Sequence, residues 1–175
     1  RIFSVSVVLH IAIAVLVLLL GVTIGYWYLE KYAVIPEGRE TAALWAYLFA
    51  LLTAAVNILR SPYDAAVIAS ERMSTYAYAG IFEAVLKLVA VWMLALSGWD
   101  KLVSYSLFVL ATVLLVALFM YLSCKIKLRE LTRFSVVREP KAYTSVMDFF
   151  GWSLLGGIVE VGGVQALVLI FNLFW

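Results

Sequence analysis

Residues 57–72, with the sequence NILRSPYDAAVIASER, put an arginine, a proline and an aspartate within an apolar stretch that begins near residue 42. Four polar residues recur along this stretch at spacings of three and four: Thr53, Asn57, Arg60 and Asp64. Those spacings place them on one face of a helix. Pro62 lacks a backbone N–H and crowds the preceding turn, so we expect the helix to kink beside Arg60.

The composition around this stretch is that of a membrane protein. Of the 175 residues, 66% are hydrophobic and 14% are charged, far from the balance of soluble domains. Apolar runs long enough to cross a hydrocarbon core of about 30 Å occupy approximately residues 2–29, 42–69, 76–97, 102–124 and 146–175. A span in lipid must satisfy its own backbone hydrogen bonds. We therefore predict an all-α, polytopic membrane protein with five transmembrane helices.

The ends of the chain and its cysteine usage add two expectations. The chain begins at Arg1 and stops at Trp175 inside an apolar run, so we expect residues 1–175 to form one transmembrane segment of a larger protein. The single cysteine, Cys124, excludes an internal disulfide and a cysteine-cluster metal site. Neither a metal nor a cofactor is expected.

Positive charge in the short loops predicts the orientation. The loop CKIKLRELTRFSVVREPK, residues 124–141, carries six basic side chains, and such loops stay in the cytoplasm. Alternation then places residues 97–102 outside, residues 70–75 inside and residues 30–40 outside. The net charge of +2 therefore reflects topology, and nucleic-acid binding is not indicated.

A second charged pair lies in the third predicted span. Glu83 and Lys87 are four residues apart with the acid first, the favourable order for an ion pair on a helix. Counted at about 1.5 Å per residue from the turn near residue 72, Arg60 and Lys87 lie roughly 16 to 18 Å deep, and Asp64 and Glu83 roughly 10 to 12 Å deep. A charge at the bilayer centre costs at least about 2.5 to 3.5 kcal/mol. These side chains therefore predict an internal polar cavity.

Two interpretations of the four charges remain open. The charges can neutralise one another as structural ion pairs. Alternatively, two cations at one depth can bind an anion that passes through the cavity, because guanidinium and ammonium groups form charge-assisted hydrogen bonds with phosphate oxygens.

The sequence resembles a known family over most of its length. Residues 60–94, RSPYDAAVIASERMSTYAYAGIFEAVLKLVAVWML, resemble the fourth and fifth helices of the polysaccharide-export flippases. These belong to the multidrug/oligosaccharidyl-lipid/polysaccharide superfamily, and the branch includes the O-antigen flippases of bacteria. Residues 100–108, DKLVSYSLF, resemble the start of the sixth helix, and residues 148–157, DFFGWSLLGG, the start of the seventh.

This resemblance implies a MATE-like transporter bundle of about twelve or more helices in two repeated halves, of which this chain is spans three to seven. It implies a multi-pass protein of the bacterial inner membrane that is not an enzyme. The implied substrate is an undecaprenyl-diphosphate-linked oligosaccharide, turned from the inner to the outer leaflet by alternating access. The other partners would be the lipid bilayer and the remaining helices of the transporter.

We assign roles to individual residues as hypotheses. Arg60 and Lys87 attract the diphosphate, and Asp64 and Glu83 orient these cations and exchange partners as the cavity opens. The polar side chains of Asn57 and Gln165 meet sugar hydroxyls.

Three residues are candidate hinges. Pro62 and the glycines Gly156 and Gly157 would let their helices bend during exchange. The glycines have a second interpretation, because small residues also let transmembrane helices pack closely.

Three other functions remain as alternatives. In a multidrug or metabolite exporter driven by H+ or Na+, Asp64, Glu83 and Glu160 would couple export to the ion, with the cations as counter-ions. An intramembrane glycosyl- or acyltransferase would need a general base or metal ligands, yet the one histidine, His10, has no partner visible in the sequence. A purely structural subunit would tolerate apolar replacement of its charged pairs.

Overall fold

The computed structural model describes residues 2–27, 31, 35, 38–96, 98, 100–128 and 132. Within these residues the elements are α1 (Ile2–Leu20), the π-helix η1 (Gly21–Gly25), α3 (Glu40–Ala69), α4 (Met73–Leu96) and α5 (Lys101–Lys127). With η1 continuing α1, four helices are long and apolar enough to cross a membrane. The described part of the chain is therefore that of a multi-pass helical membrane protein.

The first four predicted spans are confirmed, with small differences at their ends. Helix α4 begins three residues before the predicted span, and α5 runs to Lys127 rather than residue 124. The predicted span ended before Lys125, but α5 continues to Lys127. The two lysines are accommodated in its last turn, because positive side chains suit the negative end of a helix dipole. The predicted span at residues 146–175 lies outside the described residues.

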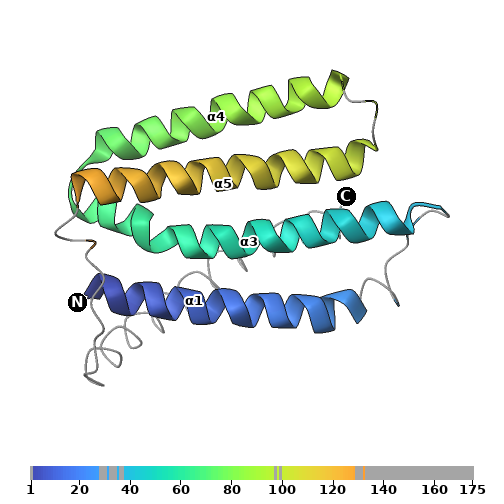
Figure 1. The fold of residues 1–175 in the computed structure, drawn as a ribbon, viewed down its shortest axis with the longest axis horizontal. Coiled ribbons are helices and arrows are strands. Elements are labelled where there is room, and N and C mark those ends of the chain that lie inside the picture. The colour runs from blue at the N-terminus through green and yellow to red at the C-terminus, as the bar shows by residue number, and fades with distance from the viewer. Residues whose placement is uncertain are drawn as a thin grey trace, which may run out of the picture.

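The helices do not pack in chain order. Figure 1 shows α5 between α3 and α4, with α1 on the opposite side of α3, and the closest packing is that of α3 with α5. Consecutive helices run in opposite directions. We call the end of the bundle at residues 70–72 and 128 the inner end, because the loop charges predict that it faces the cytoplasm, and the end at residues 38–39 and 100 the outer end.

The main buried cluster lies at the inner end. It is composed of side chains from three helices and from the residue that follows α5: Val67, Ala79, Met120, Cys124 and Leu128. Tyr63 and Phe119 pack against it. Most large apolar side chains elsewhere point outward, for example Leu88 at 71% exposed and Trp92 at 68%. An apolar exterior is what helices in contact with lipid require.

A close contact joins α1 to α3 towards the outer end. The Tyr47 hydroxyl donates a hydrogen bond of 2.7 Å to the carbonyl of Gly21, in the π-helical turn. A side chain at Gly21 would meet Leu51, and one at Gly25 would overlap the Tyr47 hydroxyl. The two glycines therefore let α3 approach α1, a contact that the sequence interpretation missed.

Pro62 is buried inside a helix that continues to Ala69. The α3 ribbon bends towards α5 over its last turns in Figure 1. A bend is expected there because Pro62 cannot donate to the carbonyl of Ile58.

Candidate functional site

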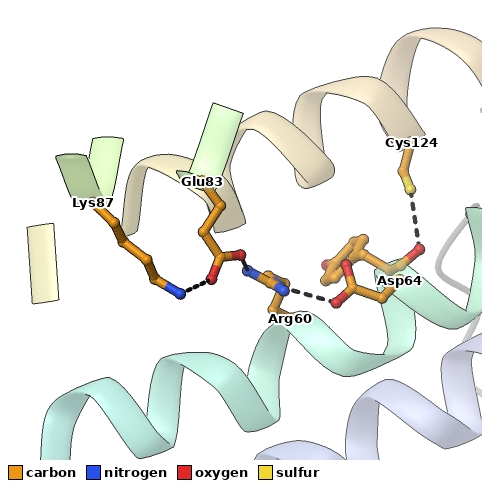
Figure 2. A network of polar contacts seen from close by, with 6 residues as sticks. Arg60, Asp64, Glu83, Lys87 and Cys124 are labelled. Atoms are coloured by element: carbon orange, nitrogen blue, oxygen red, sulfur yellow. Dashed lines mark hydrogen bonds and ion pairs between the residues drawn. The ribbon is translucent and has the colours of Figure 1, made fainter. Parts of the chain in front are cut away.

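The two charged residues of α3 form an ion pair along their own helix. The Arg60 Nε donates to the Asp64 Oδ2 at 2.9 Å, one turn apart (Figure 2). Both side chains are about one-fifth exposed. The pair thus forms on the face that the i, i+4 spacing predicted.

The same guanidinium also reaches the next helix. The Arg60 Nη1 donates to the Glu83 Oε2 at 3.3 Å, and the Lys87 Nζ donates to the Glu83 Oε1 at 2.7 Å. Figure 2 shows the resulting row, in which charges of opposite sign alternate from Asp64 through Arg60 and Glu83 to Lys87. We call these four residues the charge row. Its formal charges sum to zero, so the row itself is neutral.

The turn between α3 and α4 explains why the row forms. Glu71 has a positive φ of 56°, and the backbone N–H of Arg72 donates to the carbonyl of Val67 at 3.3 Å, so the chain reverses within a few residues. Arg60 lies eleven residues before Glu71, and Glu83 lies twelve after it. Two antiparallel helices leaving one tight turn bring such positions to the same level.

The two cations do not contact one another. Each bonds to one oxygen of the Glu83 carboxylate, so Glu83 lies between them. Their exposure differs: 19% for the Arg60 side chain and 58% for that of Lys87. Lys87 can therefore donate to a further anion without leaving Glu83, since an ammonium group has three donors.

Asp64 is bonded through one oxygen only. Its Oδ1 is buried and has no hydrogen-bond partner within the described part of the chain. Beside it, the Cys124 Sγ donates to the carbonyl of Tyr63 at 3.6 Å, also shown in Figure 2. An unsatisfied buried acceptor costs about 1 to 3 kcal/mol, so Asp64 is the residue of the row that a proton or a small cation would most stabilise.

The other predicted site residues are not part of the row. Asn57 is exposed on α3 and lies about one turn closer to the outer end than Arg60. No hydrogen bond of its side chain is found among the described residues. The Thr53 hydroxyl bonds to the carbonyl of Phe49 in its own helix, at 2.7 Å. The predicted residues Gln165, Glu160, Gly156 and Gly157 lie outside the described residues.

One ion pair near the outer end was missed by the sequence interpretation. The Arg39 Nη2 lies 3.1 Å from the Asp100 Oδ2, and the other oxygen of Asp100 accepts from the backbone N–H of Leu102 at 2.9 Å. An aspartate directly before a helix is a recognisable N-cap signal. Nothing in the sequence indicated that Asp100 pairs with Arg39, because the two residues are 61 positions apart.

The described ranges were also compared with the requirements of a metal site. No group of three or more His, Cys, Asp or Glu side chains there is placed to hold a metal ion. The Nδ1 of His10 lies 2.8 Å from the carbonyl of Ser6, one turn earlier on the same helix.

Comparison of the chain with protein-family models, with curated proteins and with solved structures found no match. The described fold and charge row define the class of the protein. It is a multi-pass helical membrane protein whose second and third spans are joined by a neutral row of four charges.

Proposed function

We propose that this chain is part of a flippase of the bacterial inner membrane that moves a lipid-linked oligosaccharide by alternating access. The undecaprenyl-diphosphate group would bind at the charge row, with Arg60 and Lys87 as its ligands. Asp64 and Glu83 hold those cations in place while the site is empty.

The observation that carries this proposal is that Arg60 and Lys87, from two different spans, both bond to the Glu83 carboxylate and still have N–H donors that are not used among the described residues. Arg60 uses its Nε and one Nη1 hydrogen within the described residues, so its Nη2 remains available. Guanidinium binds phosphate in a bidentate manner, and ammonium binds it as a point charge. A diphosphate placed beside Glu83 would therefore satisfy both cations together.

Binding of this kind would also alter the contact between the helices. The Arg60–Glu83 bond joins α3 to α4, and both partners are less than one-quarter exposed. A phosphate that takes over Arg60 weakens that link, because the guanidinium then has a stronger anionic partner. A ligand shifts a conformational equilibrium by its differential affinity for the two states, so the diphosphate would favour the state in which the helices separate.

The test uses the full-length protein with Arg60→Gln, Lys87→Gln and the double variant, each checked for membrane abundance. Lipid-linked glycan is then quantified on each leaflet. We expect normal abundance with glycan accumulating on the inner leaflet. Lys101→Gln serves as the matched control, because Lys101 is an exposed cation outside the row, and it should leave transport unchanged.

A normal rate of glycan transfer in the double variant would overturn the proposal. Arg60 and Lys87 would then be structural ion-pair partners. Loss of membrane abundance in either single variant would call for Arg60→Lys and Lys87→Arg, which keep the charge and separate folding from transport.

The buried Oδ1 of Asp64 supports a second candidate, an exporter of drugs or metabolites driven by H+ or Na+. In that protein Asp64 would take up the coupling ion on its unpartnered oxygen. Asp64→Asn would then abolish export driven by an ion gradient, whereas a flippase that uses Asp64 only to hold Arg60 would retain partial glycan transfer. Parallel assays of dye efflux and of glycan transfer distinguish the two functions.

A further inference from the structure

The two acids of the charge row are not equally neutralised. Both oxygens of Glu83 accept from cations, Oε2 from Arg60 at 3.3 Å and Oε1 from Lys87 at 2.7 Å. Asp64 accepts one bond, from the Arg60 Nε at 2.9 Å, and its buried Oδ1 has no hydrogen-bond partner among the described residues. Asp64 is therefore the acid whose negative charge is less well compensated.

The helices α4 and α1 bring no second cation to Asp64. Within the described part of the chain, its one ion pair is that with Arg60. Helix α4 contributes Glu83, a second negative charge, to the other side of the same guanidinium. The titratable group of α1 is His10, whose Nδ1 lies 2.8 Å from the carbonyl of Ser6 in its own helix.

Helix α5 faces this part of α3 with a thiol. The Cys124 Sγ donates to the carbonyl of Tyr63, the residue before Asp64, at 3.6 Å (Figure 2). The Lys125 ammonium lies over the ring of Tyr121, 5.9 Å from its centroid. Among the described residues, α5 therefore supplies no ion pair to Asp64 either.

Charge balance sets a condition on anion binding at the row. The four side chains sum to zero, whereas a diphosphate esterified at both ends carries one negative charge on each phosphate. Bound at the row, it would leave both charges uncompensated at a depth where such charges are costly. A proton on Asp64 removes one of them. It also releases Arg60 towards the phosphate, because a neutral carboxyl holds a guanidinium more weakly than a carboxylate does.

We infer that Asp64 takes up a proton when a diphosphate binds to Arg60 and Lys87, so that the anion enters the charge row together with the proton. This inference rests on the proposed function and adds the identity and the sign of its coupling. The opposite sign is expected of an ion-driven exporter, in which a positively charged drug would displace the proton.

A proton suits Asp64 better than a metal ion does. It needs only one acceptor, and the buried Oδ1 provides one. A metal ion needs several ligands, and no group of three or more His, Cys, Asp or Glu side chains in the described ranges is placed to hold one.

The test counts protons directly, with the full-length protein in detergent. The probe is a short-chain isoprenyl-diphospho-sugar, whose doubly esterified diphosphate does not itself titrate near neutral pH. Calorimetric titrations in buffers of different ionisation enthalpy give the number of protons taken up with each probe molecule. We expect a maximum of about one proton, and an affinity that falls up to about tenfold for each unit rise in pH.

Three variants assign the proton. Asp64→Asn keeps a neutral side chain, so it should take up no proton and bind the probe with an affinity that does not vary with pH. Asp64→Glu keeps a titratable carboxyl and should retain the uptake. Asp100→Asn is the matched control, because it makes the same replacement outside the row and asparagine still caps a helix. It should behave as the parent does.

Each other outcome has a definite meaning. Proton release on binding, no uptake by the parent protein, or equal uptake by the parent and Asp64→Asn would overturn the inference and leave the proposed function standing, since the probe still binds. Binding that requires Na+ and is independent of pH would also overturn it, because Na+ would then be the accompanying cation. If neither the parent nor Asp64→Asn binds the probe, the proposed function fails, and the inference with it.

Discussion

The Arg60 guanidinium and the Glu83 carboxylate, 3.3 Å apart, join two spans that each pack mainly against a third helix. Arg60 is bonded at the same time to Asp64, and Glu83 to Lys87. Replacing one of these four residues therefore affects the remaining three unequally. Measurements of stability and of transport on single variants can reveal the difference.

Replacing Arg60 should lower the stability of the protein more than replacing Asp64. Arg60→Gln leaves Asp64 without a counter-ion, although one Asp64 oxygen is already unpartnered. Asp64→Asn leaves Arg60 bonded to Glu83. We expect Arg60→Gln to lower the free energy of unfolding by about 1 to 3 kcal/mol more than Asp64→Asn, measured by thermal unfolding of the full-length protein in detergent.

The double variant Arg60→Gln/Asp64→Asn completes this thermodynamic cycle. Its loss of stability should be smaller than the sum of the two single losses, with a coupling of about 0.5 to 3 kcal/mol for residues in one network. Simple additivity would show that the 2.9 Å bond between these side chains contributes nothing.

Lys87 should affect transport more than stability. Its side chain is 58% exposed and bonds Glu83 alone among the described residues, so Lys87→Gln should change the free energy of unfolding by less than about 1 kcal/mol. The same variant would lose the proposed charge-assisted hydrogen bond to the diphosphate, which contributes about 1.5 to 3 kcal/mol. Glycan transfer should therefore slow at least about tenfold. Lys87→Arg should retain most transfer, and equal rates for the Gln and Arg variants would contradict a role in anion binding.

Replacing the whole charge row by leucine separates a structural role from a functional one. Buried ion pairs can often be exchanged for apolar side chains of similar volume without loss of stability. We therefore expect the variant with Arg60, Asp64, Glu83 and Lys87 all changed to Leu to reach the membrane at normal abundance and to transfer no glycan. Normal transfer by this variant would favour the structural subunit.

The contact of α1 with α3 should be sensitive to a single methyl group. Gly25→Ala would overlap the Tyr47 hydroxyl and force apart a contact that includes the bond from Tyr47 to Gly21. We expect a loss of about 1 to 3 kcal/mol, as for overpacked sites, again measured by thermal unfolding. Gly80→Ala is the matched control. Nothing lies within 4 Å of its added carbon, so it should be neutral or stabilising by up to about 1 kcal/mol.

Sequence periodicity predicted much of the charge row. The i, i+4 spacings of Arg60 with Asp64 and of Glu83 with Lys87 were sufficient to predict both ion pairs, because residues at that spacing are neighbours on any helix. The expectation that the two cations act side by side is refined by the structure, in which Glu83 lies between them. That arrangement depends on the relative rotation of two helices, which a count of residues along each helix does not contain.

The sequence by itself determined that this chain is a helical membrane protein, where its first four spans run and which charges lie within them. Length and apolarity decide these features, because lipid leaves the backbone little choice but a helix. The tertiary structure decided that α5 lies between α3 and α4, that Arg60 bonds to Glu83 and that Arg39 bonds to Asp100. Such pairings depend on side-chain packing between helices distant in the sequence. Packing of that kind has no periodic signature along the chain.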